Sequence, residues 1–121
     1  RSLARRCGWG TLAHHYRASG RFGGRRRHFC CLELGAGVYS HCVTVGADGD
    51  GLYLGTMFPF RPGHPSLFIP WSEVVSAKLA PMVLGPMLEL RLAAEPDLRV
   101  VLWRRAAVDA AAARRSWAAG G

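Results

Sequence analysis

The sequence predicts a mainly β fold, a bent antiparallel sheet or barrel of about seven strands with a short helix before it and a longer helix after it. Runs of alternating apolar and polar residues extend from His28 onward, as in sheets with one buried face. Fifteen glycines and seven prolines among 121 residues indicate frequent turns. This length is sufficient for a single hydrophobic core.

The elements follow from these patterns in chain order. Trp9, Leu12, Ala13 and Tyr16 have the i, i+3, i+4, i+7 spacing of one helical face, so a short amphipathic helix is expected over about residues 9–18. The alanine-rich tail 105–119 predicts the second helix, with Trp117 as an apolar anchor. The expected strands are 28–34, 38–45, 51–58, 66–71, 73–80, 87–93 and 98–103.

The positive charge is concentrated near the N-terminus, which divides the chain into a basic arm, 1–27, carrying the short helix, and a β domain, 28–119. The net charge is +8, and residues 1–28 contain eight arginines and no acidic residue. Such an arm is suited to nucleic acid or to anionic lipid headgroups, and a solvated leader is the alternative. The arginines are Arg1, Arg5, Arg6, Arg17, Arg21, Arg25, Arg26 and Arg27.

Cysteine usage and hydropathy bear on the compartment. Cys7, Cys30, Cys31 and Cys42 match no disulfide framework or redox motif, so reduced thiols in the cytoplasm are expected. No apolar run reaches the roughly 18–20 residues of a membrane span. The chain starts with Arg1 rather than Met, so an upstream targeting or membrane segment remains an alternative. Such a segment would place the domain at the inner face of a membrane.

Two acidic residues, Asp48 and Asp50, raise the question of a calcium loop. An EF-hand needs further oxygen ligands at its fifth and twelfth positions, which here are Leu52 and Pro59. The two Asp–Gly pairs are strong hairpin signals. A turn between strands is therefore favoured over a calcium site.

Zinc binding and catalysis are weakly supported. His28 and Cys30 are expected to share a strand face, and His41 or Cys42 is a third candidate ligand, but no clear fourth is present. Buried thiols are the favoured interpretation. No nucleophile elbow, phosphate-binding loop or paired-carboxylate pattern is present, so neither an enzyme nor a cofactor is predicted.

The segment "FRPGHP" is the preferred candidate for a specific contact. Its prolines stiffen a connection between two expected strands, and rigid loops on sheets often bind ligands. Arg61 is suited to a phosphate or carboxylate, and His64 to a pH-dependent contribution. The alternative is a stiff connection whose aromatic side chains close the end of the barrel.

Several motifs support a family resemblance. "GWGTLAHHYRA", "VGADGDGLYLG" and "FPFRPGHPSLFIPWSEV", covering most of residues 8–79, resemble an uncharacterised bacterial group with a pleckstrin-homology-like domain. Many members of that group have a transmembrane helix just before the "GW" segment. The resemblance implies a pleckstrin-homology-like barrel and no established activity. Arg1–Arg6 would then lie next to the membrane, on its cytoplasmic side.

Together these observations predict a non-catalytic binding module, cytoplasmic and juxtamembrane, whose partner is a protein or an anionic membrane surface. The alternative is a nucleic-acid-binding module that uses the same basic arm. The oligomeric state is not predicted. The candidate binding residues are Arg5, Arg6, Arg25, Arg26, Arg27, Arg61 and His64, with Arg1 contributing charge.

Overall fold

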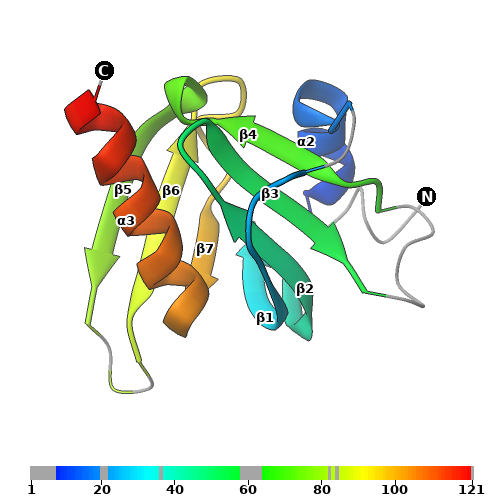
Figure 1. Ribbon diagram of the computed structural model, residues 1–121. Coiled ribbons are helices and arrows are strands. Elements are labelled where there is room, and N and C mark those ends of the chain that lie inside the picture. Colours follow the sequence, from blue (N-terminus) through cyan, green and yellow to red (C-terminus); the bar gives the residue numbers. More distant parts are fainter. Residues whose placement is uncertain are drawn as a thin grey trace.

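The computed structural model describes residues 8–19, 22–35, 37–57, 64–81, 83 and 85–120. Within these residues, two α-helices flank seven strands, and one 3-10 turn, η1, lies between β4 and β5 (Figure 1). The elements are α2 (Trp9–Tyr16), β1 (Arg26–Leu34), β2 (Gly37–Ala47), β3 (Gly51–Thr56), β4 (Leu67–Pro70), η1 (Trp71–Glu73), β5 (Val74–Ala80), β6 (Met87–Leu92), β7 (Val100–Trp103) and α3 (Arg104–Gly120).

The seven strands form one antiparallel sheet in the order β4-β3-β2-β1-β7-β6-β5. Strands β1 to β4 pair with their neighbours along the chain, and β5 to β7 do the same. β1 also pairs with β7 through residues 32–34, and this contact curves the sheet into a nearly closed barrel. The edges, β4 and β5, are joined directly by η1. The predicted fold class is confirmed.

The barrel interior is filled by one face of each strand. In β6, Leu88, Leu90 and Leu92 are buried and alternate with the partly exposed Glu89 and Arg91. This is the period-two pattern expected of a strand with one solvated face. The alternation read from the sequence therefore identifies the core correctly along this strand.

The two helices cover different parts of the barrel (Figure 1). α3 packs against β2, β5, β6 and β7 and buries four alanines there. α2 lies beside β4 and buries Trp9, Leu12 and Tyr16 in the same core. The helix predicted at residues 9–18 is therefore an integral part of the barrel's packing. The buried alanines of α3 are Ala106, Ala107, Ala110 and Ala111.

β1 and β2 bend together because each strand contains an irregularity. The pairing changes register between Arg27 and Cys30 and again between Cys30 and Leu32, as β-bulges do. Phe29 and His41 both have φ of 59°, a left-handed conformation that costs a non-glycine residue free energy. β1 and β2 lie side by side in the lower centre of Figure 1.

The β2–β3 connection is the tight turn that the Asp–Gly pairs predicted. Asp48 Oδ1 accepts hydrogen bonds from the backbone N–H groups of Asp50 and Gly51, at 2.9 and 3.0 Å. The turn is also attached to η1, since Trp71 donates its Nε1–H to the Asp48 carbonyl oxygen at 2.7 Å. The backbone N–H of Trp71 also donates to the Asp50 carbonyl oxygen at 3.1 Å.

Replacing Gly51 with alanine is expected to destabilise the protein by about 1–3 kcal/mol. A Cβ atom there would overlap the Ile69 carbonyl oxygen of β4 and lie 2.7 Å from the Phe68 ring. The backbone of the β3–β4 pair would have to move. The matched control is Gly49→Ala in the same turn, where a Cβ atom meets nothing within 4 Å. Urea unfolding midpoints compare the two variants, and equal midpoints would contradict the predicted clash.

Within the described residues, no helix has both the length and the apolar character needed to cross a membrane.

Candidate functional site

Only some of the binding residues predicted from the sequence lie in the part of the chain that the structure describes. Arg25, Arg26, Arg27 and His64 lie within the described residues. Arg25 and Arg26 are exposed where the chain enters β1. The remaining candidates lie outside the described residues; they are Arg1, Arg5, Arg6 and Arg61.

Arg27 is directed toward the C-terminal helix. Its Nε–H donates to Asp109 Oδ2 of α3 at 2.8 Å, and this hydrogen bond raises the pKa of Arg27. Arg26 and Arg27 have different surroundings because consecutive residues of a β-strand point to opposite faces. Arg26 is therefore directed toward the outer face of the sheet, and Arg27 joins β1 to α3.

His64 is held by aromatic neighbours just before β4. Its ring meets the Trp9 ring at a centroid distance of 5.3 Å and the Tyr39 ring at 5.5 Å, both edge-on. His64 Nε2 is also 3.2 Å from Tyr39 Oη. Trp9 in turn donates its Nε1–H to the Pro65 carbonyl at 2.9 Å. These contacts from α2 and β2 fix the position of a segment that belongs to no regular element.

Arg26 and His64 line one cleft of about 320 Å³ on the outer face of β1, β2 and β3, here called the basic cleft. His28 lies on its wall, with Nδ1 2.9 Å from Thr44 Oγ1. None of the described residues that line it is acidic. They are Arg26, His28, Thr44, Tyr53, Gly55, Thr56, His64, Pro65 and Ser66.

Hydroxyl groups complete the basic cleft. Tyr53 Oη and Ser66 Oγ are 3.1 Å apart and join β3 to the segment that carries His64. Thr56 is buried, and its Oγ1 has no hydrogen-bond partner among the described residues. Hydroxyl and imidazole groups next to a guanidinium form a donor-rich surface. The chemistry of this set favours an anionic ligand.

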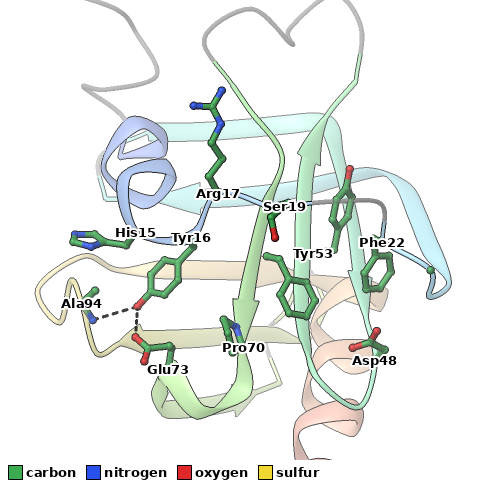
Figure 2. A pocket seen from close by; sticks show the side chains of 13 residues that line it. His15, Tyr16, Arg17, Ser19, Phe22, Asp48, Tyr53, Pro70, Glu73 and Ala94 are labelled. Atoms are coloured by element: carbon green, nitrogen blue, oxygen red, sulfur yellow. Dashed lines mark hydrogen bonds between the residues drawn. The ribbon is translucent and has the colours of Figure 1, made fainter.

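A second and larger cleft of about 670 Å³ lies on the other side of Tyr53, between the chain that follows α2 and the β3–β4 face. Phe22 stacks on Tyr53 at a centroid distance of 5.1 Å. Figure 2 shows this pair at one end and the Tyr16–Glu73 pair at the other, with the Arg17 side chain directed away from Glu73. Carboxylates and basic groups both line this cleft, so its charge favours no single ligand class.

The Tyr16 hydroxyl has a structural role in the larger cleft. It donates to Glu73 Oε1 at 2.9 Å and accepts a hydrogen bond from the Ala94 backbone N–H at 3.2 Å (Figure 2). Burial raises the pKa of Tyr16, with the Glu73 carboxylate adding to the effect against the opposing Ala94 hydrogen bond. The neutral phenol therefore connects α2 to η1 and to the loop after β6.

The cysteines near β1 and β2 are free thiols, and burial raises the pKa of both Cys30 and Cys42. A thiol with a raised pKa is a poor nucleophile at neutral pH. The expected common face of His28 and Cys30 is wrong. The bulge at Phe29 places His28 on Thr44, while Cys30 is buried in the core. Over the described residues, no group of three His, Cys, Asp or Glu side chains is placed to share a metal ion.

Sequence reasoning missed how the basic cleft is built. The sequence suggests His28 only as a metal ligand, and nothing in it marks the hydroxyls of Thr44 and Ser66. Their convergence depends on the register of three strands, and no local pattern encodes it. In the comparisons with known proteins, no family model, no curated protein and no solved structure matches the chain.

Proposed function

We propose that the protein is a non-catalytic binding module that attaches to an anionic membrane surface, with the basic cleft receiving a phosphate-bearing headgroup. The single observation that carries the proposal is the convergence of Arg26, His28 and His64 on one cleft with no acidic residue in its described lining. Two of these nitrogen-bearing side chains come from the start of β1, and His64 comes from the segment just before β4.

The chemistry of the cleft supports a phosphate ligand. The Arg26 guanidinium offers several donors in a planar fork, which suits phosphate oxygens. Hydroxyls of Thr44 and Ser66 stand within the same lining and are able to donate to further oxygens. A cleft of about 320 Å³ is at the lower end of the size range of small-ligand sites, which suits a headgroup better than a large cofactor.

The surrounding charge supports a surface rather than a free metabolite as the partner. Residues 22–32 and 37–47 contain no acidic side chain; Arg25 and Arg26 are exposed there, while Arg27 is paired with Asp109 of α3. A cytoplasmic leaflet attracts such clusters over about one Debye length. A seven-stranded barrel with a C-terminal helix is compatible with a pleckstrin-homology-like domain, and we place the domain at the cytoplasmic face of a membrane.

The double substitution Arg25→Ser with Arg26→Ser tests the proposal. It is expected to weaken binding to phosphatidylcholine–phosphatidylserine vesicles about 20- to 30-fold, since each surface arginine contributes about 1 kcal/mol. The matched control is Lys78→Ser with Arg115→Ser, which removes the same charge from exposed positions on β5 and α3. Vesicle co-sedimentation measures both variants and the unmodified chain.

Three outcomes decide between the alternatives. Tighter binding to anionic than to neutral vesicles, reduced selectively by the Arg25 and Arg26 changes, supports the proposal. Equal losses in both double variants would show only nonspecific attraction by net charge and overturn the role of the cleft. Binding to a mixed oligonucleotide without binding to anionic vesicles would overturn the membrane function in favour of nucleic acid.

A further inference from the structure

Three separate parts of the chain lie toward one edge of the barrel. The β1–β2 bend, the β5–β6 turn and the beginning of α3 all lie at the lower edge of Figure 1. Two contacts join α3 to the other segments: the Arg104 backbone N–H donates to the Pro86 carbonyl at 2.7 Å, and Arg27 binds Asp109 of α3 at 2.8 Å. The described residues of these segments are here called the lower edge, defined as 27–30, 83, 85–86 and 104–105.

The lower edge exposes apolar side chains at its projecting turns. Phe29 is 68% exposed at the bend of β1, and Val83 is fully exposed in the β5–β6 turn. A single exposed apolar residue is ordinary. Two exposed apolar side chains on the same edge, one of them a phenyl ring, are consistent with an interaction surface.

The backbone holds these positions in an unfavourable conformation. Among the described residues, the non-glycine residues with positive φ are Phe29, His41 and Arg104, and two of them belong to the lower edge while His41 lies in the opposing bulge of β2. Glycine or asparagine would adopt this conformation with less strain. Strained residues of this kind cluster at functional sites, so the phenylalanine at this bulge points to a use for its side chain.

The charges around these apolar tips are also unfavourable for the isolated helix. α3 begins with Arg104 and Arg105 and has no acidic residue in its first turn. The helix dipole favours negative side chains there and disfavours arginine. Both arginines are exposed beside the β5–β6 turn, within reach of the phosphate groups of a bilayer.

We propose that the lower edge is the membrane-contacting surface, with Phe29 and Val83 entering the boundary between headgroups and acyl chains and Arg104 and Arg105 binding the lipid phosphates. This rests on the proposed function and names how the domain meets the bilayer. Apolar burial and electrostatic attraction act together in interfacial binding, and the two signals give firmer attachment than either alone.

Tryptophan substitutions test where the protein touches the bilayer. Phe29→Trp and Val83→Trp are each expected to gain fluorescence quenching, above the unmodified chain, with phosphatidylcholine–phosphatidylserine vesicles that contain brominated acyl chains. Val75→Trp is the control, because Val75 is 59% exposed at the other end of β5. Added quenching at Val75 but at neither of the other two positions would overturn the proposed orientation.

The variant Phe29→Asn tests the contribution of the ring without straining the backbone, since asparagine tolerates positive φ. It is expected to weaken binding to anionic vesicles about tenfold, in line with loss of a partly buried phenyl ring. Val75→Asn should leave binding unchanged, and circular dichroism verifies that both variants are folded.

The outcomes separate this inference from the proposed function. Phe29→Asn could bind as tightly as the unmodified chain while the Arg25 and Arg26 double variant binds more weakly. That result would exclude the lower edge as the membrane-contacting surface and support the role of the basic cleft. If the unmodified chain ignores anionic vesicles, the proposed function and this inference fail together. If Phe29→Asn weakens binding to neutral and anionic vesicles by the same factor and Phe29→Trp is quenched, the insertion is supported.

Discussion

Replacing Trp71 with alanine is expected to lower the free energy of unfolding by about 3–5 kcal/mol. Trp71 is fully buried in η1, which joins the two edge strands of the sheet. Removing its indole would leave a cavity in the core and remove the donor that reaches the Asp48 carbonyl at 2.7 Å. The loss would affect the β2–β3 turn and the β4–β5 corner together.

Trp71→Phe separates the two contributions. It keeps most of the apolar volume and removes only the Nε1–H, so the expected cost is about 1–3 kcal/mol for a carbonyl left without its donor. Urea unfolding followed by far-ultraviolet circular dichroism measures both variants, because this signal does not depend on the substituted indole. If Trp71→Ala and Trp71→Phe had the same midpoint, cavity formation would not be the main cause.

Replacing Trp9 with alanine is the second large change, with an expected loss of about 3–5 kcal/mol. Trp9 is fully buried although it belongs to a short helix outside the sheet. Its ring packs on Tyr39 and His64, and its Nε1–H holds the Pro65 carbonyl. The substitution should therefore release α2 and disturb one wall of the basic cleft.

Trp117→Ala is the matched control for Trp9. Trp117 lies near the end of α3 and is only partly buried against the core, so its replacement should cost less than that of Trp9. Native-state hydrogen exchange of the α2 amides supplies a second readout. Unchanged protection of α2 in Trp9→Ala would contradict the anchoring role, even if global stability fell.

Much of the fold was predictable because burial on one face imposes a period of two. β6 shows this directly, with Leu88, Leu90 and Leu92 inside and Glu89 and Arg91 outside. The bend of β1 and β2 was not predictable, because no glycine marks the bulges at Phe29 and His41. The alternation assumed across both strands fails there, and with it the expected pairing of His28 and Cys30.

The candidate site was predictable only as separate residues. Arg26 was selected for its charge and His64 for its proline-rich neighbourhood, and the structure places both on one cleft. The barrel register brings them together, and that register depends on pairings among distant segments. Val83 lies in the most apolar stretch of the sequence, but its full exposure follows from the turn geometry, which hydropathy does not reveal.

The pairing of β1 with β7 has a consequence for folding kinetics. Residues 32–34 of β1 meet residues 100–102 of β7, whereas the other pairings of the sheet join strands adjacent in sequence. Closing so long a loop costs more chain entropy than forming a hairpin. The β1–β4 and β5–β7 meanders are therefore expected to form early, and the seam between β1 and β7 to close last and set the folding rate.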